Sequence, residues 1–430
     1  MKVSFPYPGI PSLEIPESAS ISWLEPRILS EHEEKEVDII KKGLENPVGL
    51  PRIREMVKGK KKILILVDDY TRNTPIHIIL PEVLKEMSAA GINKTNIRLL
   101  IASGTHRPMT QEEKLKKLGH RVMADYTVLD HRYDDPGELV QLHNTAGGTE
   151  IWVNRTVIES DYVIGIGQIV PHRVAGLSGG GKIIQPGACG AVTTGQTHWL
   201  SAQFPGTEII GRIDNPVRRE IEAVAKAAGL KFIANAVLDG KAKIVHCICG
   251  DPLEAFRLGA RKSMEIFGIP MPEPVDIVIT DSYPADLNLW QAAKGIYSAD
   301  LALKPGGILI LVTPCPEGVS AEHPQILDIG YRSFTEVESM VKRGEIQDLT
   351  LAAHLVHVGR IICEKATGVI VSSGIEPQTA AKLGFHWAAS PQEALTFALK
   401  RKGKKASIAV LKNGGEIMPV IRSTDNELQG

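Results

Sequence analysis

The chain has 430 residues, of which 43% are apolar and 23% are charged, and its formal net charge is −1. A length of this order predicts two domains whose cores need no disulfides. The balanced charge disfavours nucleic-acid binding, and five cysteines are too few for a disulfide framework. We find no secretory signal and no apolar run of about 18 residues, so we expect a cytoplasmic protein without a membrane span.

Short apolar runs rich in β-branched residues alternate with amphipathic stretches along the chain. Unbroken apolar runs are typical of strands buried on both faces of a parallel sheet. In chain order, strands are predicted at residues 63–67, 97–102, 162–166, 232–237, 244–248, 275–280, 308–312, 369–371 and 408–411. The predicted helices cover residues 81–90, 111–118, 216–228, 252–267, 285–303, 334–343 and 391–400.

This alternation predicts an α/β protein with mostly parallel sheets. The sequence GIPMPEP at 268–274 holds three prolines, which exclude helix interiors and central strands, and it is the best candidate for a domain boundary. We therefore expect an N-terminal α/β domain at 1–270 and a C-terminal α/β domain at 271–430. An active-site cleft is expected between them.

The loops that follow the first-half strands are rich in functional groups. In open α/β sheets, ligands bind beyond the carboxyl ends of the strands. The sequences are DDYTR (68–72), SGTHR (103–107), PHR (171–173) and the segment from 176 to His198. Asp69 and Arg72 fit either a capping carboxylate beside a surface arginine, or polar ligand contact with a guanidinium that reaches a carboxylate or phosphate.

Residues 176–182 read GLSGGGK and match the P-loop pattern GxxxxGK. The next residue is Ile183, where a P-loop needs Ser or Thr to hold magnesium, so a nucleotide phosphotransferase is a weak alternative. The glycines would let the backbone approach a planar or anionic ligand closely. The amine of Lys182 could then bond covalently to a ligand carbon. A tight turn with a solvated lysine fits the same letters.

Three histidines stand in these loops. His106 and His172 each follow a strand and each precede an arginine. A pair of imidazoles on opposite sides of one carbon is what a racemase or epimerase needs, because each is acid in one direction and base in the other. His198 lies sixteen residues after Lys182 without a Cys or His cluster, so most ligands of any metal there must come from another molecule.

The motifs DDYTR, SGTHR, PHRVAGLSGGGK, TTGQTH and WQAAK, in this order and spacing, resemble the lactate racemase family with its nickel-pincer nucleotide. PHxxAGxSGGGK followed by a histidine sixteen residues later is a specific signal. The resemblance covers motifs from about Asp68 to Lys294. It implies a pyridinium mononucleotide, carrying a thioamide and a thiocarboxylate, that is covalently attached at Lys182. Nickel would be held by two sulfurs and a carbon of that group and by His198, a planar set that suits nickel.

The resemblance also assigns roles to other residues. His106 and His172 would be the two acid/bases, while hydride moves between the substrate α-carbon and the cofactor. The remaining positions would hold cofactor and substrate: Asp69, Tyr70, Thr71, Arg72, Gln291 and Lys294. Because a keto-acid intermediate must not escape, two domains closing over the site are expected. Cofactor-biosynthesis proteins are the implied partners.

The sequence departs from this pattern at Trp290, where a tyrosine is expected, and it gives no motif for a C-terminal aromatic that contacts the site; Trp387 is a candidate. The leading interpretation is an isomerase that racemises or epimerises a short 2-hydroxy acid, such as lactate, by hydride transfer. A non-catalytic homologue that handles the cofactor is the alternative from another class. It would need Lys182 but not the pair His106 and His172.

Overall fold

The computed structural model describes residues 1–17, 19–29 and 34–421. The chain forms two compact units that alternate along the sequence. The first unit contains residues 27–201 and 211–266, and the second contains 1–26, 202–210 and 267–430. The division therefore differs from two consecutive segments, because the first 26 residues and 202–210 belong with the C-terminal part. Within the described residues, no helix has both the length and the apolar character needed to cross a bilayer.

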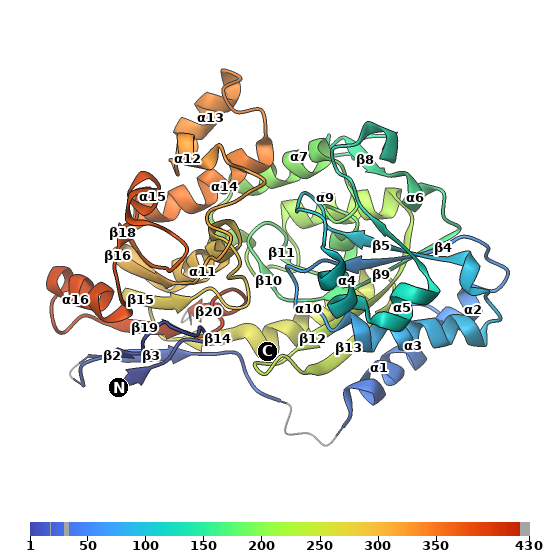
Figure 1. The fold of residues 1–430 in the computed structure, drawn as a ribbon, viewed down its shortest axis with the longest axis horizontal. Helices are drawn as coiled ribbons and strands as arrows, with labels where there is room; N and C mark the ends of the chain where they lie inside the picture. The colour runs from blue at the N-terminus through green and yellow to red at the C-terminus, as the bar shows by residue number, and fades with distance from the viewer. Residues whose placement is uncertain (18, 30–33, 422–430) are drawn as a thin grey trace, which may run out of the picture. The chain divides into compact units, whose positions relative to one another are not determined.

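The first unit is built on a sheet that has six strands among the described residues, in the order β13-β12-β9-β4-β5-β6 (Figure 1). All neighbours are parallel except β12 and β13, which are antiparallel. The bounds are β4 (Ile63–Asp68), β5 (Ile97–Ala102), β6 (Thr127–Asp130), β9 (Tyr162–Gln168), β12 (Leu230–Leu238) and β13 (Ile244–Gly250). Every residue of β4 and β9 is buried, as expected for central strands covered on both faces.

Alternate residues of these strands face two different layers. Ile65, Leu99 and Ile164 pack with apolar residues from the helices of one layer. These helices are α1 (Glu36–Glu45), α2 (Ile53–Met56), α3 (Ile76–Ala89), α4 (Gln111–Leu118) and α5 (His120–Asp125). On the other face, Gly165 lies against Ile183 of the 3₁₀ turn η3 (Gly180–Ile183), and helix α9 (Pro216–Ala227) packs on η3. The segment with the glycine-rich motif therefore covers the second face.

The strand order reverses direction at β4. The chain passes from β4 outward to β5 and β6, and then returns to place β9 and β12 on the other side of β4. Open α/β sheets bind ligands beyond the carboxyl ends of the strands at such a switch point. The turns after β4, β5 and β9, which carry the sequence motifs, therefore leave the sheet at its expected binding edge.

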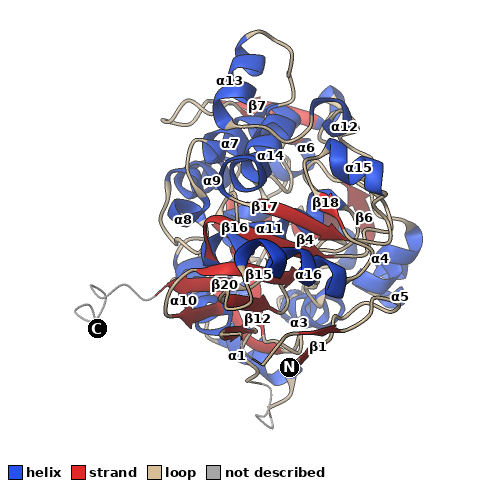
Figure 2. Cartoon of the chain, turned by 90° about the vertical axis from the view of Figure 1, so that its left-hand side faces the viewer, coloured by secondary structure: helices blue, strands red, loops and turns tan. Residues whose placement is uncertain are grey.

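The second unit has a parallel sheet in the order β18-β17-β16-β15-β19-β3, of which Figure 2 labels β15, β16, β17 and β18. Its strands are β3 (Ile21–Leu24), β15 (Val275–Asp281), β16 (Leu303–Val312), β17 (Thr367–Val371), β18 (His386–Trp387) and β19 (Ile408–Leu411). Ile308 and Ile310 pack on helix α16 (Pro391–Lys402). Leu311 points to the opposite face, where Gly295 of helix α11 (Leu289–Ala302) lies against it. The two helices thus cover opposite faces of the sheet.

Shorter elements complete the two units. The two-stranded pairs are β1 (Lys2–Val3) with β2 (Leu13–Glu14), β7 (Leu139–Leu142) with β8 (Ile151–Asn154), β10 (Pro171–His172) with β11 (Gly176–Leu177), and β14 (Gly268–Met271) with β20 (Met418–Ile421). The other helices of the described residues are α6 (Arg155–Ile158), α7 (Ala191–Ala202), α8 (Gly206–Ile209), α10 (Glu254–Phe267), α12 (Ile326–Ile329), α13 (Phe334–Lys342), α14 (Leu349–Gly359) and α15 (Pro377–Lys382). There are also two 3₁₀ turns, η1 (Lys94–Asn96) and η2 (Pro136–Glu138), and a π-helical segment, η4 (Arg360–Lys365).

The predicted α/β class, the nine predicted strands and the seven predicted helices are confirmed, with small differences at their ends. One boundary is wrong: α3 begins at Ile76, so Pro81 lies inside the helix rather than at its start. Proline removes only one hydrogen bond there, and the complete burial of Ile76 and Ile79 outweighs that loss. The proline-rich boundary sequence includes a short strand, β14, in which Pro270 pairs in parallel with Val420.

Candidate active site

The turn after β4 is closed by a nearly buried lysine. Lys117 of α4 places its ammonium 2.8 Å from Oδ1 of Asp68. The same ammonium donates to the backbone carbonyls of Asp69, at 2.9 Å, and Arg72, at 2.7 Å. The other oxygen of Asp68 accepts a hydrogen bond from Thr74. One cation therefore fixes both ends of the DDYTR turn, and the residues between them are held in one conformation.

Asp69 joins this turn to His106 in the loop after β5. Its Oδ2 lies 2.7 Å from Nδ1 of His106, and its Oδ1 accepts hydrogen bonds from the backbone amide and hydroxyl of Thr71, at 3.1 and 2.6 Å. Burial by itself would raise the pKa of Asp69, but His106, Arg72 and Thr71 together hold that pKa well below its ordinary value. The carboxylate is ionised and can only accept. The proton of neutral His106 is therefore on Nδ1, and Nε2 carries the lone pair of a base.

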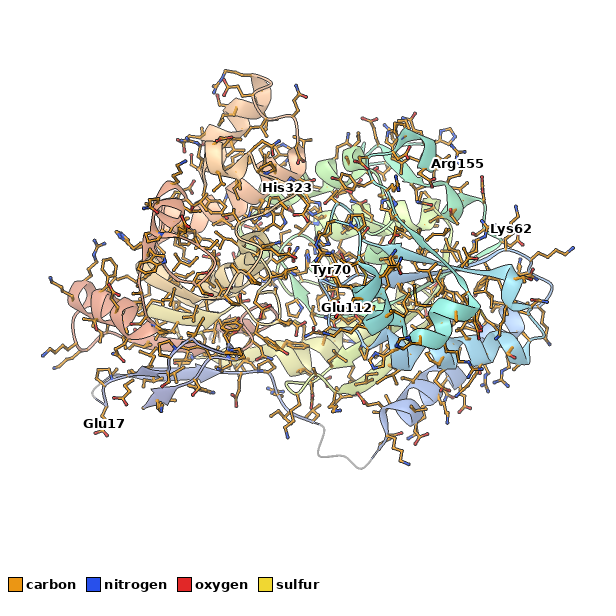
Figure 3. All side chains as sticks on the ribbon, viewed as in Figure 1. Glu17, Lys62, Tyr70, Glu112, Arg155 and His323 are labelled. Atoms are coloured by element: carbon orange, nitrogen blue, oxygen red, sulfur yellow. The ribbon has the colours of Figure 1, made fainter. Side chains whose placement is uncertain are left out.

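The rest of the turn is also ordered. The guanidinium of Arg72 donates to the carbonyl and hydroxyl oxygens of Thr71, at 3.1 and 3.0 Å. Tyr70, labelled in Figure 3, stacks with the guanidinium of Arg107, whose carbon lies 4.1 Å from the ring centroid. Arg107 is held in turn by a two-pronged pairing with Glu113, at 2.9 and 2.8 Å. The four predicted cofactor-binding residues 69–72 thus lie in one turn, and Tyr70 of that turn contacts Arg107, the residue after His106.

His172 is held in the opposite way. It ends strand β10, and its Nδ1 accepts hydrogen bonds from the backbone amides of Val174, at 3.1 Å, and Ala175, at 3.4 Å. A backbone amide can only donate, so Nδ1 of His172 carries the lone pair and the proton of the neutral ring is on Nε2. His106 and His172 are therefore fixed in opposite tautomers.

Close packing against neighbouring side chains explains why two positions of the SGGGK motif are glycine. A Cβ on Gly179 would lie 2.5 Å from Ile169, and one on Gly180 would lie 2.9 Å from the Phe256 side chain. Both glycines also have a positive φ, +83° and +59°, which side chains disfavour. We expected these glycines to admit a ligand to the backbone. The contacts correct this for Gly179 and Gly180, because protein atoms already occupy the space.

Lys182, on η3, is partly buried. Burial is the main cause that lowers the pKa of its amine well below the ordinary lysine value, and the charges of Arg72 and Arg218 add to it. Among the described residues, none accepts a hydrogen bond from this amine. The amine is therefore more often neutral than an ordinary lysine and suited to nucleophilic attachment.

The sequence predicts a polar loop around His198, but the structure places His198 on helix α7. Its Nδ1 is 2.8 Å from the carbonyl oxygen of Thr194, one helical turn earlier. A carbonyl can only accept, so the proton is on Nδ1 and Nε2 carries the lone pair. This arrangement is usual for histidines that bind metals. Among the described residues, no group of three or more His, Cys, Asp or Glu side chains is placed to hold a metal ion.

In the second unit, Gln291 and Lys294 lie on α11, as their spacing predicted. The ammonium of Lys294 donates to Oε1 of Gln291 at 2.8 Å, so both side chains share one helical face. Helix α11 begins after Asn288, whose side chain caps the backbone amide of Gln291 at 3.0 Å. The cap fixes where Gln291 stands in the first turn.

Sequence reasoning missed a stack of rings around Trp290. The indole lies between His323 (labelled in Figure 3), with ring centroids 4.1 Å apart, and His354, at 3.8 Å. His354 contacts the hydroxyls of Tyr297, at 3.3 Å, and Tyr331, at 3.4 Å. No motif in the sequence connects these residues: Trp290 and Tyr297 lie on α11, His354 lies on α14, and His323 and Tyr331 lie in loops. Trp387, our earlier candidate aromatic, is 37% exposed on the edge strand β18.

Comparison with known proteins identifies the family. The N-terminal domain of lactate racemases, as a family, matches residues 9–209, and the C-terminal domain of lactate racemases matches residues 271–419. The lactate racemase of Thermoanaerobacterium thermosaccharolyticum is 35% identical over 294 residues, which cover 67% of this chain and 68% of that protein. The chain belongs to the lactate racemase family. It is accordingly a racemase, an enzyme of the isomerase class.

Three further comparisons extend over nearly the whole chain. The lactate racemase of Lactiplantibacillus plantarum is 29% identical over 387 residues, 88% of this chain and 90% of that protein. A solved lactate racemase apoprotein from T. thermosaccharolyticum superposes with a TM-score of 0.86 at 27% identity, covering 98% of this chain and 100% of the other. A Thermotoga maritima protein, 23% identical, shares the fold with a TM-score of 0.72, covering 90% of this chain and 98% of the other.

Proposed function

We propose that this lactate racemase homologue interconverts the enantiomers of a short 2-hydroxy acid, with lactate as the first candidate. The observation that carries the proposal is the 2.7 Å contact that orients His106 through Asp69, in a unit that also holds His172 in the opposite tautomer. A base and a donor are thereby prepared for one substrate. The relatives' names support lactate as that substrate.

We further propose that the chain holds a nickel-pincer nucleotide, attached at Lys182 and ligated through His198. Two features support the fit. The amine of Lys182 has a lowered pKa. The Nδ1 proton of His198 is directed to the carbonyl of Thr194, so the lone pair that would bind the metal is on Nε2. The bound group would supply a hydride acceptor for the substrate α-carbon. Residues 69–72, Gln291 and Lys294 are proposed contacts to this group or to the substrate.

The residues of the chain then have distinct tasks. His106 takes up the hydroxyl proton at Nε2, and Asp69 stabilises the imidazolium that forms. Because the amides of Val174 and Ala175 donate to Nδ1, the neutral ring of His172 carries its proton on Nε2 and can offer that N–H to a substrate. To take up a proton it must first release Nδ1 from the amides of Val174 and Ala175. The guanidinium of Arg72 is a proposed partner for a carboxylate or phosphate, since it carries a fixed charge with several donors.

The alternatives explain less of the structure. A P-loop enzyme is disfavoured because Ile183 packs against Gly165, and because strand β10 lies between β9 and the glycine motif, whose first two residues form β11. A non-catalytic cofactor carrier is disfavoured by the Asp69–His106 pair, because a carrier has no use for an oriented base. We also propose a cytoplasmic location, which the five free cysteines support, and loading by cofactor-biosynthesis proteins.

The proposal is tested with protein co-produced with cofactor-making proteins. Intact-protein mass should show an adduct on the wild type and on Lys116→Ala, an exposed control, but none on Lys182→Ala. The loaded wild type should racemise a 2-hydroxy acid from a panel of lactate, malate, 2-hydroxyglutarate, phenyllactate and aldonic acids. A full adduct on Lys182→Ala, or a loaded protein that racemises none of the panel, would refute the proposal.

A further inference from the structure

A fully buried arginine binds the backbone between His172 and Lys182. Arg218, in the first turn of α9, is 1% exposed. Its Nε donates to the carbonyl of Ala175 at 3.2 Å, and its Nη1 donates to the carbonyl of Gly179 at 3.2 Å. Its Nη2 donates to the carbonyl of Leu177. One guanidinium thus binds three alternate carbonyls of the segment 175–179.

The neighbours of Arg218 hold it in this position. Asn215, the residue that caps α9, accepts from the amide of Arg218 at 2.8 Å and donates to the carbonyl of Ala175 at 3.4 Å. The guanidinium carbon lies 4.1 Å from the ring centroid of Phe256, the residue that also fills the space above Gly180. Burying a cation is costly unless it is hydrogen-bonded. Here backbone carbonyls, which no substitution removes, meet that need.

The clamped segment is directly connected to both functional side chains. The amide of Ala175 is one of the two donors to Nδ1 of His172, and Arg218 holds the carbonyl of the same residue. At the other end, the carbonyl of Gly179 accepts from the amide of Lys182 at 3.2 Å as well as from Arg218. A displacement of this segment would therefore change the surroundings of His172 and Lys182 together.

We propose that Arg218 is a positioning residue that sets the tautomer of His172 and the placement of the Lys182 amine by fixing the backbone at 175–179. The inference rests on the proposed function in that it gives those two side chains their roles. The charge of Arg218 contributes in the same direction, because it is one of the causes that lower the pKa of Lys182, after burial and Arg72. Geometry and charge are separable: a lysine at 218 keeps the charge but lacks the fork of donors.

The test uses the full-length apoprotein and three variants. Arg218→Met removes charge and donors, Arg218→Lys removes donors only, and Arg219→Met is the matched control. Arg219 is the next residue of the same helix, but its side chain is 66% exposed and pairs with Asp214. Long-range ¹H–¹⁵N NMR reads the tautomer of each histidine. Acetic anhydride labelling at a series of pH values, read by peptide mass, gives the reactivity of Lys182.

The expected results differ between the variants. Arg218→Met should lose the single Nε2–H form of His172 and should shift the labelling midpoint of Lys182 upward by about one pH unit, which slows labelling about tenfold below the midpoint. Arg218→Lys should disturb His172 but keep the midpoint near the wild-type value. Arg219→Met should change neither, and the Nδ1–H form of His106 should persist throughout.

Wild-type signals for both His172 and Lys182 in Arg218→Met would overturn the inference. If Arg218→Met does not fold, Arg218→Lys decides, and an undisturbed His172 in that variant would overturn it equally. Failure of the proposed function is recognised separately, because it would show as a wild-type protein without an adduct on Lys182. The apoprotein measurements do not depend on loading.

Discussion

Two segments of the first unit hold one proposed acid/base each, and they do so by different means. The turn at 68–72 and the loop of His106 are held by side-chain charges, with Lys117 on the carbonyls and Asp69 on the imidazole. The segment 171–182 is held through its backbone, with amides on His172, carbonyls on Arg218 and glycines under neighbouring side chains. A change in one carboxylate, that of Asp69, should therefore alter the state of His106, whereas the state of His172 depends on the backbone conformation of the segment 171–182.

The difference extends to the chemistry of the two histidines. A carboxylate that accepts from Nδ1 leaves the lone pair of His106 on Nε2 and so prepares His106 as a base. Amides that donate to Nδ1 place the proton of the neutral His172 ring on Nε2 and so prepare His172 as a hydrogen-bond donor. The pair is thus asymmetric at rest, although racemisation requires proton transfer on both faces.

Removing either imidazole should cause the largest loss of racemisation. His106→Ala and His172→Ala should each suppress racemisation in both directions by about 10²–10⁴-fold, the usual scale for losing a general acid or base. The surviving ring serves only one face of the substrate, so it does not replace the other. Initial rates from each pure enantiomer provide the measurement. A variant that retains wild-type rates from both enantiomers would remove that histidine from the mechanism.

Asp69→Asn should change the tautomer of His106 to the one that His172 has. With the amide nitrogen facing His106, Nδ1 must accept, so the proton moves to Nε2 and the base is lost. We expect racemisation to fall about 10–10²-fold or more, and NMR should show the Nε2–H form of His106. The tautomer of His172 serves as the internal control. An unchanged Nδ1–H form of His106 would contradict the role assigned to Asp69.

Gly180→Ala should reveal the backbone dependence of the second segment. The added methyl meets Phe256 and adopts a positive φ, so we expect the free energy of unfolding to fall by about 2–4 kcal/mol. Gly91→Ala is the control, since Gly91 also has a positive φ but no atom within 4 Å of the added Cβ. It should cost only about 1 kcal/mol. Equal losses in chemical denaturation would mean that packing at Gly180 is unimportant.

The pH dependence of the free energy of unfolding should reveal the charge of Asp69, on which the segment around His106 depends. The folded pKa of Asp69 lies below its ordinary 3.8, so its contribution is present above about pH 4 and is lost as the pH falls through the folded pKa. Above pH 5 the free energy of unfolding of the wild type should exceed that of Asp69→Asn by about 1–3 kcal/mol, the usual cost of unpairing buried groups. This difference in the free energy of unfolding should narrow below pH 4. A gap that widens on acidification would contradict this sign.

The sequence predicted most of the fold because periodicity and strand-end loops are local signals. Unbroken apolar runs located β4, β5 and β9, and the motifs behind them located His106, His172 and Lys182. Three features depended on distant residues. Arg218 approaches the glycine segment from about forty positions later in the chain, Trp290 meets His354 across the second unit, and Gly180 is required by Phe256. Pairings of this kind leave no local pattern.

The fate of the substrate α-hydrogen distinguishes the proposed hydride transfer from proton abstraction. A loaded enzyme given one enantiomer of α-deuterated lactate in ordinary water should produce the other enantiomer with its deuterium retained. The reason is that the hydrogen travels as a hydride, while the histidines move only the hydroxyl proton. A two-base enzyme that abstracts a carbon-bound proton would release the label to solvent. Loss of deuterium in step with racemisation, read by mass, would contradict the proposed chemistry.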